Sequence, residues 1–370
     1  MKYLTHISGL FFLISPILSN YVFWGALSIG DMTLLLSLIF FINQIKINNF
    51  LIICFFMSSF VVLISYSIFI YNGQVPSSFY RASFYLMILP LFLSLSKSFY
   101  LLILHKYLKV SLILSIFLIT QLFFYYIFNI TLIMQLPIET IEDDTLNVIE
   151  IQSGGFRAAG LFREPSYLAI YLIPALLYYT KYSILDKYFF YFLILIASTS
   201  SLGIFFAILS LFFVGLNAIK FKKSFTSFII LFPVLLVGFL GYMVTTTNVA
   251  ILRFFDLTRG GGSLEERFFN MFKVLQDFSF FVNFDLSKKV LIYNFNETWY
   301  NSFVYLVSNF GLIFIIPFCF FWSKVGLIGM VSTLILLILT HSFSSPFFTI
   351  FLLICYCIFN KNFSKPLSSI

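Results

Sequence analysis

Residues 50–71 read FLIICFFMSSFVVLISYSIFIY, without a single Asp, Glu, Lys, Arg or His. As an α-helix this run would extend roughly 33 Å, at ~1.5 Å per residue, which is enough to cross the hydrocarbon core of a bilayer. Similar runs recur along the chain, so that 61% of its 370 residues are hydrophobic and 10% are charged. Soluble proteins carry about 25% charged residues. The chain therefore needs a bilayer as its solvent, and its composition excludes a soluble enzyme, a secreted disulfide scaffold and a disordered protein.

The recurring apolar runs predict an all-α polytopic membrane protein with about 12 transmembrane helices. They lack the alternation of apolar and polar residues that the strands of an outer-membrane barrel would show. The first run continues past Pro16 without a small-residue cleavage site, so we expect an anchor rather than a signal peptide. Within 188–219, the polar run Ser198-Thr199-Ser200-Ser201 predicts a break. The expected spans are 7–23, 26–42, 50–71, 81–96, 108–130, 165–181, 188–200, 202–219, 224–246, 298–322, 325–341 and 345–359.

Most lysines fall in short segments on one side of these spans, which the positive-inside rule assigns to the cytoplasm together with both termini. The formal charge of +8 therefore orients the chain and does not indicate nucleic-acid binding. The opposite side holds the two long polar segments, 131–164 and 247–297. Loops longer than about 12–15 residues are usually functional or disordered. We therefore treat 1–370 as a single integral membrane domain with two large loops on the side opposite the cytoplasm.

The arginines are distributed differently from the lysines. All six lie on the outer side of the predicted topology, at Arg81, Arg157, Arg163, Arg253, Arg259 and Arg267. A guanidinium offers a planar fork for phosphate or carboxylate groups, which an ammonium does not. The distribution predicts an outward-facing site for an anionic ligand. The alternative is that these side chains pair with loop acids or lipid headgroups. No metal site is expected, because the cysteines sit in apolar runs without zinc-type spacing.

The first loop ends in Gly160-Leu161-Phe162-Arg163-Glu164-Pro165-Ser166. Proline is favoured in the first turn of a helix, so a helix is expected to start at Pro165. Its exposed N–H groups, with Arg157 and Arg163, would form an anion site without a metal. Glu164 is the carboxylate that directly precedes this helix. The alternative is that Arg163 pairs with Glu164 and merely closes the loop.

The second loop carries Arg253 and Arg259 before three consecutive glycines, 260–262. Ser263 and Glu266 then fit the capping box that opens a helix. The apolar residues that follow share one face, which predicts an amphipathic helix on the membrane surface. Arg267 would lie at the edge of that face, at the depth of lipid phosphates.

These features resemble the bacterial O-antigen polymerase (Wzy) family, with the O-antigen ligases as more distant kin. Besides the hydropathy plan, the resemblance rests on three segments. They are Arg157-x-x-Gly160-x-Phe162-x-Glu164-Pro165-Ser166, the helix opening at Ser263 to Arg267, and Tyr300-Asn301-Ser302-Phe303 followed by Gly311-Leu312-Ile313. Two departures favour a polymerase over a ligase. Tyr300 stands where the ligases have a histidine, and Ser200-Ser201-Leu202-Gly203 replaces their Ser-Arg-Gly pattern.

The resemblance implies a metal-independent glycosyltransferase of lipopolysaccharide biosynthesis in the Gram-negative inner membrane. It would join undecaprenyl-diphosphate-linked oligosaccharide repeats on the periplasmic face, with undecaprenyl diphosphate as leaving group and no cofactor. Membrane lipids are expected partners, a chain-length regulator protein is a further candidate, and no nucleic acid is expected. The expected catalytic residues are Glu164, Arg157 and Arg267, and the expected substrate-binding residues are Arg163, Arg253, Arg259, Tyr300, Asn301 and His341.

Two alternatives stay open. The first is an O-antigen ligase. The second is a polysaccharide flippase or transporter, which would need ionisable residues within its spans. Asp31 and His341 lie near the ends of expected spans, and this argues against transport.

The topology can be tested directly with reporter fusions. Fusions after Lys46, Lys109 and Lys223 should report a cytoplasmic location, because the positive-inside rule places these lysines there. Fusions near Asp144 and Gly261 should report a periplasmic location. A cytoplasmic signal at Asp144 would contradict the placement of the whole predicted site.

Overall fold

The computed structural model describes most of the first 132 residues, three single residues that follow them and four later stretches. The described residues are 2–24, 27–71, 73, 75, 77–132, 134, 136, 138, 158–198, 200–220, 301–340 and 343–360. They are mostly helical. The helices are α1 (Lys2–Ile14), α2 (Ile29–Phe41), α3 (Asn49–Tyr71), α4 (Ser77–Phe92), α5 (Lys97–Phe128), α7 (Pro165–Tyr182), α8 (Leu185–Ala197), α9 (Ser201–Lys220), α14 (Ser302–Phe310), α15 (Ile315–Leu339) and α16 (Pro346–Phe359). Short 3-10 helices cover Ile17–Asn20, Ile42–Gln44 and Gly311–Phe314, and an antiparallel pair joins β1 (Val22–Trp24) to β2 (Leu27–Ser28).

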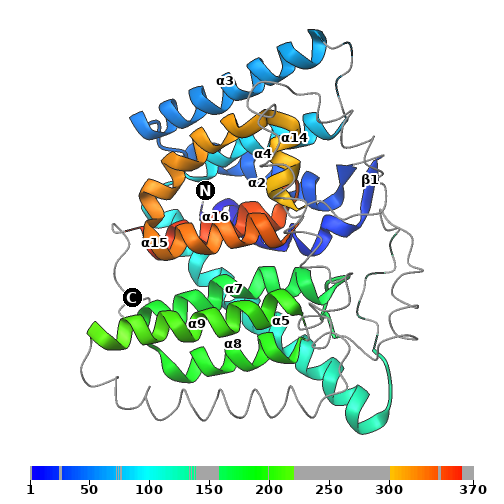
Figure 1. Cartoon of the computed structure of the whole chain (residues 1–370). Coiled ribbons are helices and arrows are strands. Elements are labelled where there is room, and N and C mark those ends of the chain that lie inside the picture. The colour runs from blue at the N-terminus through cyan, green and yellow to red at the C-terminus, as the bar shows by residue number, and fades with distance from the viewer. Residues whose placement is uncertain are drawn as a thin grey trace, which may run out of the picture. The chain divides into compact units, whose positions relative to one another are not determined.

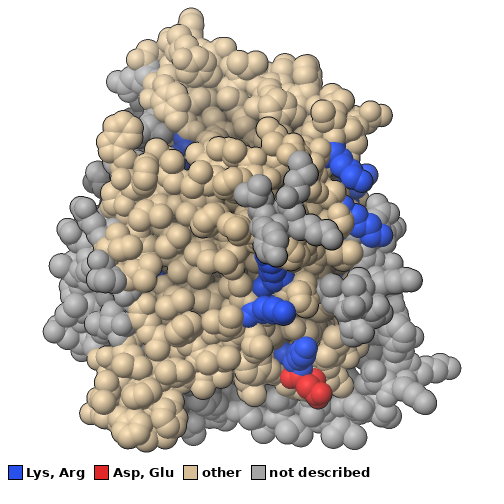
Figure 2. All heavy atoms as spheres, turned by 180° about the vertical axis from the view of Figure 1, so that it is seen from behind, with Lys and Arg blue, Asp and Glu red and all other residues tan. Residues whose placement is uncertain are grey.

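Three helical stretches of the described chain are long and apolar enough to cross a membrane, namely Asn49–Tyr71, Lys97–Phe128 and Ser302–Leu339. The face of the molecule in Figure 2 carries few charged side chains among its described residues. The predicted all-α class is thus confirmed in its coarse form, as a mostly helical chain with helices of membrane-spanning length. The number of about 12 spans stays a prediction. The second loop, 247–297, with its amphipathic helix, lies outside the described residues.

Several helix ends follow from proline, serine and glycine. α7 begins at Pro165 as predicted, and the expected break within 188–219 is present between α8 and α9. α15 is interrupted at Gly326, whose φ of 68° suits a residue without a Cβ. The expected span 7–23 is helical only in its first part, because α1 ends at Ile14. Pro16 lacks an amide hydrogen and disfavours the helical conformation of the residue before it.

The chain divides into two compact units, and the first comprises residues 1–19, 29–104 and 261–365. Within this unit α1 packs on α2, and α3 packs on both α4 and α15 (Figure 1). α16 packs on α15 and also contacts α2 and α4. Aromatic rings fill its core, with Phe12 and Phe92 5.0 Å apart and Phe41 and Phe99 4.4 Å apart between ring centroids. Large aromatic side chains supply most of the apolar area that such a core can bury.

The second unit comprises residues 20–28, 105–260 and 366–370. Its α7, α8 and α9 lie side by side (green in Figure 1). α7 contains Pro174, and a proline inside a helix removes one backbone hydrogen bond and displaces the neighbouring turn. The Tyr107 hydroxyl lies at this point, where it donates to the carbonyl oxygen of Tyr171 and accepts from the amide of Ala175 at 3.1 Å. A side chain from α5 therefore satisfies backbone groups next to the proline.

Candidate functional site

The turn that leads into α7 is the best-defined part of the predicted site. Gly160 has a φ of 62°, a left-handed conformation that glycine adopts without strain. The amide of Phe162 donates to the carbonyl oxygen of Ala159 at 3.1 Å, which closes the turn. The Phe162 ring is buried and lies 5.7 Å from the ring of Tyr171 on α7. Backbone conformation and an aromatic anchor thus fix this turn against the helix that follows it.

A buried side chain from α5, Gln121, holds the same turn. Its Oε1 accepts hydrogen bonds from the amides of Ala159 at 3.1 Å and Gly160 at 2.7 Å. Its Nε2 donates to the carbonyl oxygens of Gly160 at 3.3 Å and Leu132 at 3.0 Å. Gln121 is 4% exposed, so these contacts replace water for the turn's backbone groups. This role could not be predicted from the sequence, because an isolated glutamine in an apolar run has no distinctive spacing.

Arg163 and Glu164 follow directly on this turn, and Glu164 is the residue that precedes α7. Arg163 is only 8% exposed, although its guanidinium is permanently charged. Burial of a charge is tolerated only where other groups compensate for the lost water. This degree of burial argues against Arg163 as a surface anchor for headgroups. Glu164 is half-buried, and its Oε2 accepts a hydrogen bond from the Ser166 hydroxyl at 2.9 Å.

Asn301, a predicted substrate-binding residue, belongs to the other unit and begins α14. Its Oδ1 accepts from the amide of Val304 at 2.7 Å, which is the bonding of a helix N-cap, and the residue is 2% exposed. The next residue, Ser302, donates from its hydroxyl to the carbonyl oxygen of Thr340 at 2.7 Å and accepts from the amide of Phe343 at 3.0 Å. Asn301 therefore has a structural role in starting the helix. Its contact with a substrate stays a prediction.

The remaining predicted site residues are not placed by the structure. They lie outside the described residues and comprise Arg157, Arg253, Arg259, Arg267, Tyr300 and His341.

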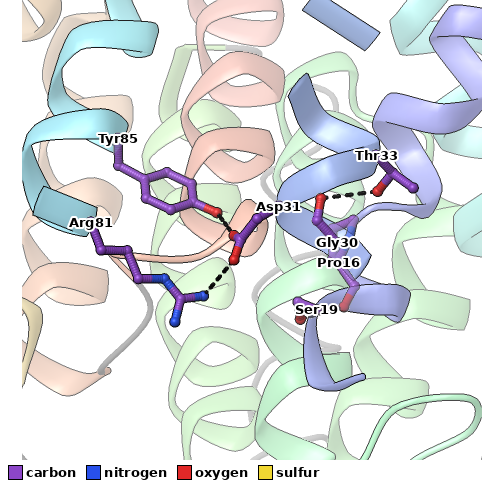
Figure 3. A network of polar contacts seen from close by, with 7 residues as sticks. All are labelled: Pro16, Ser19, Gly30, Asp31, Thr33, Arg81 and Tyr85. Atoms are coloured by element: carbon purple, nitrogen blue, oxygen red, sulfur yellow. Dashed lines mark hydrogen bonds and ion pairs between the residues drawn. The ribbon is translucent and has the colours of Figure 1, made fainter. Parts of the chain in front are cut away.

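A second charged cluster was missed by the sequence analysis, which placed Asp31 and Arg81 near the ends of spans. In the first unit, the Arg81 Nη2 donates to Asp31 Oδ2 at 3.0 Å, and the Tyr85 hydroxyl donates to Asp31 Oδ1 (Figure 3). Asp31 is 2% exposed. Part of this cluster could be expected from the sequence. Arg81 and Tyr85 are four residues apart, so their side chains share a face of the helix.

Comparison with known proteins gave no match: no family model fits the sequence, and no curated protein and no solved structure is significantly similar to it. The resemblance to the O-antigen polymerases therefore stays a prediction that rests on the residues themselves. The structure adds the geometry of two arginine environments, that of the buried Arg163 before α7 and that of the half-buried Arg81 on α4.

The Gln121 contacts lead to a stability prediction. Gln121→Leu keeps much of the side-chain volume but leaves buried amides of the turn without an acceptor, at a cost of about 1–3 kcal/mol for each buried group. The variant should unfold at a lower temperature than the parent in detergent solution, as followed by intrinsic fluorescence. Gln121→Glu keeps acceptor oxygens and should fall between the two. Thr120→Val, at an exposed neighbouring hydroxyl, is the control. An unchanged unfolding temperature for Gln121→Leu would contradict the role of this side chain.

Proposed function

We propose that this protein is an O-antigen polymerase of the Gram-negative inner membrane. The observation that supports it most is the turn before α7, where the segment that resembles the polymerase motif is tightly held by Gln121 and Phe162. That turn carries Arg163 and Glu164 side by side at the start of a helix. A cation, a carboxylate and a helix N-terminus are the groups that transfer from a phosphorylated donor requires.

The proposed reaction joins two lipid-linked oligosaccharides. The bond between the anomeric carbon of one donor sugar and its diphosphate breaks, and undecaprenyl diphosphate leaves with the bonding electrons. An acceptor hydroxyl forms the new glycosidic bond, and its proton passes to Glu164. Arg157, Arg163 and Arg267 stabilise the negative charge that develops on the diphosphate. Arg253, Arg259, Tyr300, Asn301 and His341 complete the substrate site.

The proposal includes the finer topology. About 12 spans, with both termini in the cytoplasm, would place 131–164 and 247–297 in the periplasm. A lipid diphosphate in the outer leaflet would then reach Arg157 and Arg267 without leaving the membrane surface. A chain-length regulator and membrane lipids are the proposed partners.

Transport of a lipid-linked saccharide is the second candidate function. It is favoured by one observation, the ion pair of the buried Asp31 with the half-buried Arg81. Ionisable residues within membrane helices commonly mark the path of an ion or a polar substrate. We place this function second because the pair lies at the first turn of α2 and the N-terminal half of α4, not at the middle of either helix.

Deletion of the gene distinguishes the functions. A strain that lacks the polymerase should still attach single repeat units to its lipid A-core but should show no ladder of longer chains on a lipopolysaccharide gel. Loss of a ligase would leave the core bare while lipid-linked polymer accumulates. Loss of a flippase would trap the units on the cytoplasmic side. A bare core would therefore count against the proposal.

The arginines can be tested with substitutions that keep their charge. Arg157→Lys and Arg267→Lys retain a cation but lose the guanidinium fork. Charge-assisted hydrogen bonds contribute about 1.5–3 kcal/mol each, so loss of one should slow polymerisation about tenfold or more. Ladder formation is compared at matched membrane levels, with Lys288→Arg, in the same loop as Arg267, as the control. Wild-type ladders from both variants would reduce the arginines to membrane anchors.

A further inference from the structure

The cluster of Asp31, Arg81 and Tyr85 is asymmetric in its burial. The Asp31 side chain is 2% exposed, whereas the side chain of Arg81 is 29% exposed. Each carboxylate oxygen of Asp31 accepts from a different residue of α4, because Arg81 reaches Oδ2 and Tyr85 reaches Oδ1. The carboxylate is therefore oriented by two donors from one face of α4 and acts as a fixed support for the guanidinium.

The backbone beneath Asp31 is equally constrained. A Cβ at Gly30 would lie 2.3 Å from the carbonyl oxygen of Ser15 and 2.6 Å from the Cα of Ser19, closer than real contacts allow. α2 can therefore begin against the 15–19 turn only because residue 30 is glycine (Figure 3). The Thr33 hydroxyl donates to the carbonyl oxygen of Gly30 at 2.9 Å and closes the first turn of α2. Asp31 has little freedom to move away from α4.

The same end of α4 is also tied to α14. Ser78, one helical turn before Arg81, donates from its hydroxyl to the Asn309 side chain at 3.1 Å. Its carbonyl oxygen accepts from the Tyr305 hydroxyl at 2.8 Å. The helix segment that carries Arg81 is thus bonded to both α2 and α14, and the N-cap residue of α14 is Asn301 of the third motif of the resemblance.

We infer that Arg81 is a binding site for a phosphate-bearing anion, with Asp31 and Tyr85 as the residues that position its guanidinium. The ion pair is a dipole whose negative end is buried and whose positive end is accessible. Because Asp31 neutralises part of the charge, binding must depend on oriented N–H donors more than on net charge. A phosphate or diphosphate group suits a planar donor fork of this kind.

This inference rests on the proposed function for the identity of the natural ligand, a lipid-linked diphosphate, and the binding chemistry is shared with phospholipid headgroups. Inorganic diphosphate and phosphatidylglycerol are therefore the two probes. The full-length protein, purified in a sugar-based detergent, is titrated with each probe and affinity is measured from the shift in unfolding temperature and by native mass spectrometry.

Four variants separate positioning from simple charge. Arg81→Lys keeps the charge and should weaken diphosphate binding about tenfold, through loss of the fork. Asp31→Asn removes a negative charge, which alone would strengthen anion binding, but we expect weaker binding because the guanidinium loses its support. The double variant Asp31→Asn with Arg81→Gln removes both charges together and should fold while losing the site. Lys46→Gln, which removes an exposed cation elsewhere, should bind as the parent does.

Weaker diphosphate binding in Arg81→Lys and Asp31→Asn supports the site for a diphosphate substrate. If these variants lose affinity for phosphatidylglycerol but not for diphosphate, the result supports the site and assigns it to phospholipid headgroups. Unchanged affinity for both probes in Arg81→Lys, or stronger binding in Asp31→Asn, overturns the inference. A failure of the proposed function is recognised separately, because the ladder of a deletion strain does not depend on this measurement.

Discussion

A bilayer offers no hydrogen-bond partners in its hydrocarbon core, so a chain this apolar must satisfy its polar groups internally. Helices do so for regular backbone, and the described residues are accordingly mostly helical. The costly positions are those where a helix is interrupted. At Pro174 the Tyr107 hydroxyl bonds the neighbouring carbonyl and amide, and before α7 the Gln121 side chain bonds the backbone of a whole turn. At these two interruptions a neutral side chain thus takes the place of water, and the fold depends on these contacts.

The same constraint governs charge. An ionised side chain away from water costs several kcal/mol unless it is paired, so a buried charge is rarely accidental. The Asp31–Arg81 pair meets this cost by pairing, with Tyr85 as a second donor to the carboxylate. Replacement of such a pair by apolar residues is often neutral or stabilising. Stability alone therefore gives a weak reason for the pair, and a functional role for its more exposed member is the more informative hypothesis.

Local features of the fold could be predicted from the sequence, because they depend on neighbouring residues. Pro165 marks the start of α7, and the serine-rich break separates α8 from α9. Features that join distant residues could not be predicted. Asp31 and Arg81 are 50 positions apart, and Gln121 reaches residues 38 and 39 positions away. Hydropathy patterns describe one helix at a time and carry no information on which helices pack together. Asn301 illustrates a different limit, since the same side chain suits a substrate contact and the N-cap bond that it makes to Val304.

The two arginine environments use the same physical device in separate units. In each, a glycine is required for the backbone. Gly160 adopts a left-handed conformation, and Gly30 lets the backbone pack closely against residues 15–19. In each, a buried polar side chain from another helix fixes the local geometry, Gln121 in one case and Asp31 in the other. Preorganised donors stabilise developing negative charge more than mobile ones, because they need no reorganisation when the charge appears. Under the proposed function, the contacts that satisfy irregular backbone would also hold these arginines in position for an anion, so that one structural requirement would serve both the fold and the proposed chemistry.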